Sequence, residues 1–192
     1  MASCGSLGGL FGFQPKEGGS TPTLPLQFCD IGLDDALAFN AKHHSRLPSL
    51  GKNSLNAPRV FYGAFVGETL VGVAIWSNPV ARAYNGKGYI ELRRMALYGA
   101  PRHTASKMLG WMARDIAKRF PNLVRLLSYS DDTVHTGTIY RAAGWWSEAA
   151  SAGGVWDCPS RRRARYATEE PVGRQRVPKT RWWKPLANKE EQ

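Results

Sequence analysis

A short segment, 127–145, concentrates side chains that can carry out acid–base chemistry. It offers a hydroxyl, a carboxylate, an imidazole and a phenol, on Ser128, Asp131, His135 and Tyr140. A carboxylate can hydrogen-bond an amine, a histidine can take its proton near neutral pH, and a phenol can protonate a leaving group. This set can serve acid–base catalysis on a bound substrate, and we expect all four residues to be catalytic.

Each of these residues also has a structural interpretation. Tyr140 can pack beneath the strands that follow it, and Asp131 or Asp132 can cap the next helix. His135 can be a solvated loop histidine. The residues alone leave both interpretations open.

The hydropathy pattern predicts the elements that position this segment. Apolar runs predict strands at 24–29, 59–66, 70–77, 89–97, 123–129, 145–151 and 154–157, and periodic runs predict helices at 34–44, 104–120 and 136–143. This order predicts an α/β (α+β) fold, a mixed central sheet with helices on both faces. From Pro159 onward the pattern is lost.

Two further groups of polar residues are candidates for substrate binding. His43 and His44 end a predicted helix, where a histidine can equally be a favourable C-terminal cation. Alternation along the strand at 89–97 puts Glu91 and Arg93 on one face and Arg94 on the other. One arginine would then face the substrate cleft, and a plain ion pair with Glu91 is the alternative.

The sequence holds no spaced metal motif. Its three cysteines, at 4, 29 and 158, fit no zinc pattern and are expected to be reduced cytosolic thiols. A metal held by His43 or His44 together with Asp131 and His135 is conceivable, but no spacing requires one.

The charge distribution favours an anionic partner. The net charge is +11, and residues 161–192 hold ten Lys and Arg against four Asp and Glu. Arg161, Arg162 and Arg163 are expected to bind phosphate, and aromatic residues between the cations can stack on exposed bases. The alternative is that Trp182 and Trp183 pack on the protein's own sheet.

These patterns predict three regions. A flexible arm spans 1–23, a catalytic domain spans 24–158, and a basic, Arg- and Trp-rich tail spans 159–192. No apolar run is long enough for a transmembrane helix, and the start lacks the pattern of a signal peptide. We therefore expect a cytoplasmic protein without a membrane partner.

The run Ile139-Tyr-Arg-Ala-Ala-Gly-Trp145 resembles a signature of GNAT acyltransferases. The resemblance implies that Tyr140 protonates the departing coenzyme A thiolate. It also implies a phosphate-binding loop before the helix at 104–120, which would hold acetyl-CoA or a related acyl donor through backbone amides. The residues of that loop are Arg102, Thr104, Ala105 and Ser106; Arg102 and Ala105 fit the family pattern, whereas its glycines are missing.

A longer pattern resembles the phage Mom family. The matching residues are Ser128, Tyr129, Ser130, Asp131, His135, Gly137, Ile139, Tyr140, Ala142 and Trp145, with further agreement at 42–48, 62–65, 72–74 and 91–97. The resemblance implies a GNAT-fold enzyme that converts adenine in double-stranded DNA to an N6-carbamoylmethyl-type base with a small-molecule donor, which shields phage DNA from restriction.

The same resemblance implies that several of these matching segments bind substrate or DNA. The residues concerned are His43, His44, Arg46, Arg93, Arg94 and Tyr129. Two other functions stay open on the sequence: an ordinary GNAT N-acetyltransferase that uses acetyl-CoA on a protein or small amine, and a non-catalytic DNA-binding protein.

Overall fold

The structure is a computed structural model that describes residues 25–151 and 178–186. The predicted arm at 1–23, the predicted strand at 154–157 and the three arginines at 161–163 lie outside the described residues. The described elements run in the order β1 (Leu26–Asp30), α1 (Leu33–His43), η1 (Lys52–Ser54), β2 (Val60–Val66), β3 (Thr69–Ser77), η2 (Arg82–Tyr84), β4 (Tyr89–Leu97), α2 (Thr104–Arg119), β5 (Arg125–Asp131), α3 (Thr138–Ala142), β6 (Trp146–Ser151) and β7 (Lys179–Pro185).

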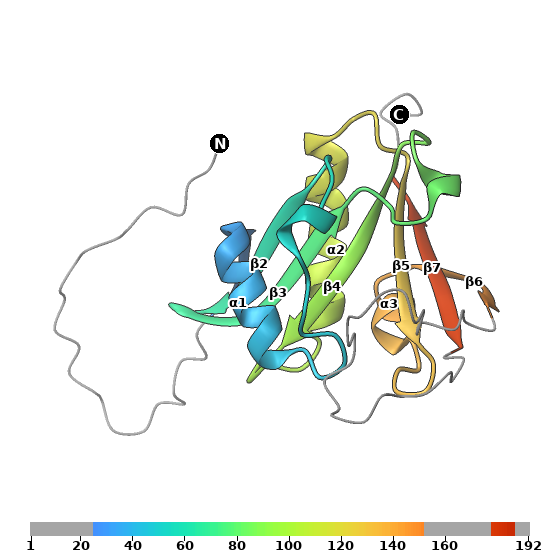
Figure 1. The fold of residues 1–192 in the computed structure, drawn as a ribbon. Helices are drawn as coiled ribbons and strands as arrows, with labels where there is room; N and C mark the ends of the chain where they lie inside the picture. The colour runs from blue at the N-terminus through green and yellow to red at the C-terminus, as the bar shows by residue number, and fades with distance from the viewer. Residues whose placement is uncertain (1–24, 152–177, 187–192) are drawn as a thin grey trace, which may run out of the picture.

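The seven strands of the described residues form one mixed sheet, and a mixed central sheet is what the sequence predicted. Its order is β1-β2-β3-β4-β5-β7-β6, with β4 and β5 parallel and every other neighbouring pair antiparallel. Helix α1 lies on one face of the sheet and α2 on the other (Figure 1). None of the described helices is long and apolar enough to cross a membrane.

Strand alternation supplies apolar side chains to both faces of the sheet. Tyr62 and Trp76 join the large core under α2, whose buried stripe includes Met108 and Met112. Ile75 points to the opposite face and packs with α1 in a smaller cluster. The long helix predicted at 104–120 is therefore confirmed, because its apolar residues recur every three or four positions and all meet the sheet.

The tail contributes a strand that the sequence pattern did not predict. Strand β7 lies between β5 and β6, so β5 and β6 do not pair directly. Trp182 on β7 is only 2% exposed, and its ring stacks on Tyr140 with centroids 5.1 Å apart. The alternative that a tail tryptophan packs on the protein's own sheet is thus correct for Trp182.

A β-bulge changes the faces that β4 presents. Ile75 pairs with Arg94 and Trp76 pairs with Leu92, so Arg93 is an extra residue in the ladder. The expectation that Arg93 and Arg94 face opposite sides is therefore wrong, because one extra residue breaks the alternation. Both guanidinium groups donate hydrogen bonds to the segment between α1 and β2: Arg93 donates to the Ser54 carbonyl and Arg94 to the Leu47 carbonyl.

Candidate functional site

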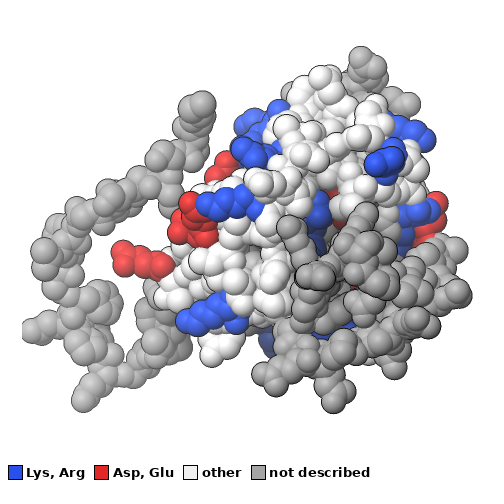
Figure 2. Space-filling view, viewed as in Figure 1, with Lys and Arg blue, Asp and Glu red and all other residues white. Residues whose placement is uncertain are grey.

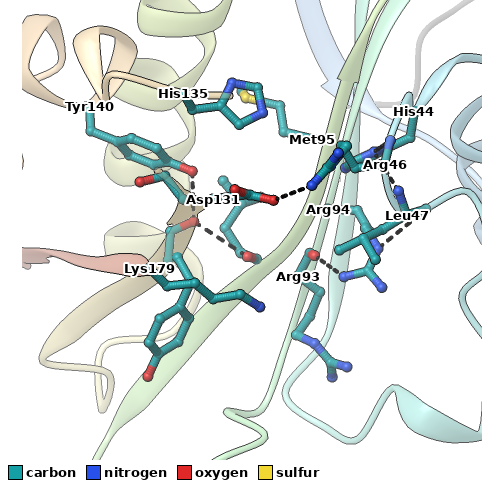
Figure 3. A pocket seen from close by; sticks show the side chains of 14 residues that line it. His44, Arg46, Leu47, Arg93, Arg94, Met95, Asp131, His135, Tyr140 and Lys179 are labelled. Carbon is teal, nitrogen blue, oxygen red and sulfur yellow. Dashed lines mark hydrogen bonds and ion pairs between the residues drawn. The ribbon is translucent and has the colours of Figure 1, made fainter. Parts of the chain in front are cut away.

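A pocket opens where β4 and β5 separate. The parallel ladder between these strands ends at Leu92 and Ser128, and the residues beyond that point line a cavity of about 120 Å³ (Figure 3). The lining comes from the loop after α1, the second half of β4, the end of β5, the turn and helix that follow β5, and the first residue of β7. Its members are His44, Arg46, Leu47, residues 92–95, residues 128–131, His135, Tyr140 and Lys179.

Asp131 ends β5 and is held on both oxygens. Its Oδ1 accepts hydrogen bonds from the backbone N–H and the hydroxyl of Thr133, and its Oδ2 accepts one from Arg46 Nη2 at 3.0 Å. Burial alone would raise the pKa of Asp131, but these hydrogen bonds outweigh it and hold the pKa below its ordinary value. Asp131 is therefore a carboxylate at neutral pH.

The helix-cap interpretation of the two aspartates is wrong. The N-cap of α3 is Gly137, with a φ of 72°, and no side chain caps that helix. Asp132 instead accepts hydrogen bonds from the N–H and the hydroxyl of Thr180 on β7. The two neighbouring carboxylates therefore have separate tasks: Asp131 faces the pocket, and Asp132 fastens the tail strand.

His135 lies beside Asp131 because the chain turns back after β5. The backbone N–H of His135 donates to the Asp131 carbonyl at 2.9 Å, and the residue lines the pocket from the turn before α3. It is an exposed histidine on a loop, yet one that borders the cavity (Figure 3).

Tyr140 is packed in the core through its ring and borders the pocket with its hydroxyl group. Its ring stacks on Trp182 and packs edge-on against Trp145, and its hydroxyl lies 2.8 Å from the Ser128 hydroxyl at the pocket wall. Burial raises the pKa of Tyr140, an effect that the hydrogen bond to Ser128 only partly opposes. The phenol is thus protonated at neutral pH and can donate a proton.

His44 is a neutral imidazole and not the helix-terminal cation that the sequence allowed. Burial, with Arg94 and His135 nearby, lowers its pKa to about 4. Its Nδ1 accepts hydrogen bonds from the backbone N–H groups of Arg46 and Leu47 at 3.3 and 3.1 Å. The proton of the neutral ring is therefore on Nε2, which leaves a hydrogen-bond donor at the pocket.

The two β4 arginines have different partners. Arg93 lies 3.6 Å from Glu91, so the ion pair that the sequence left open does form. Burial raises the pKa of Glu91, against hydrogen bonding from the Val80 N–H and the positive charge of both arginines. Arg94 donates to the Leu47 carbonyl and so secures the loop that carries His44 and Arg46.

The pocket wall is strongly cationic. Four cations line it, and Asp131 is the only carboxylate among the described lining residues; the cations are Arg46, Arg93, Arg94 and Lys179. Such a wall favours a ligand that carries negative charge beside the group that contacts Asp131.

Several predicted residues lie elsewhere. His43 points away from this lining and stacks on Tyr98 with ring centroids 4.3 Å apart. The predicted donor loop forms the start of α2, where Thr104 and Ala105 are buried and Arg102 is exposed. The Thr104 N–H donates to the Pro101 carbonyl at 3.2 Å, whereas the Ala105 and Ser106 amides have no carbonyl partners within the helix, as is usual at a helix N-terminus. No group of three or more metal-ligating side chains that could hold a metal occurs among the described residues.

Lys179 is a pocket residue that the sequence pattern did not indicate. This residue pairs with Asp131 in the β5–β7 ladder and lines the pocket. Its position in a charged, proline-containing run carried no signal of a strand.

Comparisons with known proteins identify the family and the fold of the chain. The profile of the Mom protein family matches residues 27–168. A search of curated proteins finds no match. Among solved structures, the ribosomal-protein-S18-alanine N-acetyltransferase from Escherichia coli has a TM-score of 0.59 at 9% identity and covers 87% of this chain and 97% of its own.

Two further structures have the same fold. A probable acetyltransferase from Staphylococcus epidermidis has a TM-score of 0.60 at 8% identity, over 85% of this chain and all of its own. A Bacillus subtilis acetyltransferase in complex with CoA has a TM-score of 0.55 at 12% identity, over 84% of this chain and 98% of its own. At these identities the likeness establishes the fold, which is that of the GNAT acetyltransferases.

Proposed function

The chain belongs to the Mom protein family, and on that premise we propose that it is a GNAT-fold transferase that modifies the N6 amine of adenine in DNA. The product is an N6-substituted adenine of the carbamoylmethyl type, and its role is to protect phage DNA from restriction. The observation that carries this proposal is Asp131, an ionised carboxylate fixed by Arg46 at the open end of a cationic pocket.

The chemistry of adenine explains the need for such a carboxylate. The N6 lone pair is delocalised into the ring, so the amine is a poor nucleophile until an acceptor draws on its N–H. Asp131 can accept that hydrogen bond, and His135 beside it can take the proton as the new N–C bond forms. The carboxylate also orients the amine toward the donor carbon.

Tyr140 serves the opposite end of the reaction. As the N–C bond forms, the bond between the donor carbon and its leaving group breaks, and the leaving group needs a proton. A buried phenol holds that proton at neutral pH, and the Ser128 hydroxyl, 2.8 Å from the phenol oxygen, fixes its direction. These two residues therefore supply a general acid.

An acyl-CoA-type donor fits the start of α2. Such a donor carries its transferable carbon on a thiol leaving group. Direct acyl transfer gives an N6-acyl adenine, which is an amide; an N6-carbamoylmethyl adenine requires a donor that presents a CH2 carbon to the amine. The small side chains of Ala105 and Ser106 permit close approach of a phosphate to their amides, and the exposed Arg102 adds positive charge.

The dimensions of the pocket support an extruded base. A cavity of about 120 Å³ is far smaller than a duplex, so a target adenine must leave the base stack to reach Asp131. Arg46, Arg94 and Lys179 on the wall can then neutralise the phosphates that flank the base.

A restriction challenge tests this function. Plasmid from bacteria that express the chain is incubated with endonucleases whose sites contain adenine, and with others whose sites contain only G and C. We expect resistance to the first group and full cutting by the second. Equal cutting by both groups, in cells shown to contain folded protein, would contradict adenine modification.

A further inference from the structure

One half of the sheet face that carries α1 has no helix over it within the described residues. Helix α1 contacts β2, β3 and β4, whereas β5, β7 and β6 continue beyond it (Figure 1). This half presents every second side chain of these strands, including Arg125 of β5 and both Arg181 and Trp183 of β7.

Four aromatic rings and one guanidinium group follow one another across this half-face. The Trp146 ring stacks on the Trp183 ring, with centroids 6.1 Å apart and an angle of 21° between the planes. The Arg125 guanidinium lies 4.3 Å from the centroid of the same Trp183 ring. The same guanidinium lies 5.2 Å from the centroid of Tyr89, whose ring in turn packs against Tyr84 of η2. We call these five residues the aromatic–arginine row.

The outer end of the row is open. Trp146 is 62% exposed on β6, the edge strand, where a tryptophan contributes little to the core. An exposed indole with its face parallel to a neighbouring ring offers a stacking surface to a further planar group.

The row is basic and continuous with the pocket. Arg82 and Lys87 are exposed around η2, and Figure 2 shows Lys and Arg side chains at the upper right of this face. Arg181, which lies over the Tyr84 ring and forms an ion pair with Glu148, is the cross-strand partner of Tyr129, a residue of the pocket wall. A polymer bound along the row can therefore reach the pocket.

We propose that the aromatic–arginine row binds the unstacked DNA strand next to the target adenine, a role that rests on the proposed function. Aromatic faces stack on bases of any sequence, and interleaved cations bind the phosphates between them. This arrangement matches single-stranded DNA better than a duplex, whose bases are already stacked on one another.

Fluorescence anisotropy with a labelled single-stranded oligonucleotide of about a dozen nucleotides tests the proposal. We expect Trp146→Ala to weaken binding about tenfold and Trp146→Phe, which keeps a ring, to restore most of it. Arg125→Gln should lower the dependence of log affinity on log salt by about 0.7, the value for one lost phosphate contact. Arg114→Gln, an exposed cation on α2 behind the sheet, is the matched control and should bind like the parent chain.

Parent-like affinity and salt dependence in both Trp146→Ala and Arg125→Gln, with melting temperatures unchanged, would overturn the proposal. The readout is separate from base modification. If these variants bind the strand as tightly as the parent chain and still modify plasmid, the row does not bind the strand and the proposed function stands. If the variants bind the strand more weakly but the parent chain leaves plasmid unmodified, the role of the row in strand binding is supported and the proposed function is contradicted.

Discussion

Arg46 and Asp131 meet across the pocket, with the Arg46 Nη2 donating to Asp131 Oδ2 at 3.0 Å although 85 residues separate them in the chain. Arg46 lies on the loop after α1, and Asp131 ends β5. The pair joins the two sides of the opening in the sheet. Together with the two hydrogen bonds from Thr133, the pair holds the pKa of Asp131 below its ordinary value, and it fixes the direction of the carboxylate.

Replacing Arg46 with glutamine should therefore act through Asp131. The pKa of Asp131 should rise toward its ordinary value because a cation and a hydrogen bond are lost. Carboxyl NMR across an acid titration measures this change, and Arg102→Gln, an exposed arginine outside the pocket lining, is the control. An unchanged Asp131 titration in Arg46→Gln would show that the ion pair does not govern the carboxylate.

Tyr140→Phe separates chemistry from packing. The ring keeps its stack on Trp182, so stability should change by only about 1 kcal/mol, the typical worth of one hydrogen bond. The rate of modification should fall about 100-fold or more if the phenol is the general acid. Ser128→Ala, which removes only the partner hydroxyl, should lower the rate less, and a larger loss in Ser128→Ala than in Tyr140→Phe would contradict the assignment.

His44 should titrate far below an ordinary histidine. NMR of its ring protons is expected to give a pKa of about 4, against 6.5 for an unperturbed histidine. In Arg94→Gln the pKa should rise, because one of the causes that lower it is removed. A midpoint near 6.5 in the parent chain would mean that the ring is solvated and not tied to the Arg46 and Leu47 amides.

The same shift has a consequence for stability. Between pH 6.5 and about 4 the unfolded chain holds a proton on His44 that the folded chain lacks, so stability should fall as the pH drops through this window. His44→Asn keeps an acceptor for the two amides and removes the titrating group. Its unfolding free energy should decline less over this window, as measured by denaturant titration at a series of pH values. An equal decline would assign the acid sensitivity to other groups.

Gly137 tests the contact between α3 and the tail strand. Gly137 and Gly86 share a φ of 72°, but a Cβ at Gly137 would overlap the Trp182 ring, whereas a Cβ at Gly86 would meet nothing within 4 Å. Gly86→Ala should cost about 1–2 kcal/mol for the left-handed backbone. Gly137→Ala should cost a further 1–3 kcal/mol or so for overpacking, measured by thermal or denaturant unfolding. Equal costs would mean that β7 does not hold Trp182 against α3.

Local patterns in the sequence predicted the helices and strands whose buried and exposed side chains follow a regular period. The α2 stripe and the hairpin of β2 and β3 follow from apolar periodicity, and the segment from Ser128 to Tyr140 carries its chemistry within one stretch of sequence. These features depend on near neighbours in the chain, so they can be predicted from the sequence.

Features that depend on distant neighbours were missed. Strand β7 mixes Arg, Lys and Trp, because only Trp182 meets the core while Arg181 and Trp183 face the other side. Its pairing with β5 joins residues about 50 positions apart, and that pairing brings Lys179 to the pocket. The bulge at Arg93 is likewise invisible to a rule of strict alternation.

Nucleoside mass spectrometry tests the central claim most directly. Plasmid DNA from bacteria that express the parent chain is digested to nucleosides and compared with DNA from cells that express Asp131→Asn, which keeps the shape of the side chain and removes its charge. We predict a deoxyadenosine species with the added mass of a carbamoylmethyl group, placed on N6 by fragmentation, in the parent sample and its loss in the variant. Unmodified deoxyadenosine in both samples, or equal modification in both, would contradict the account.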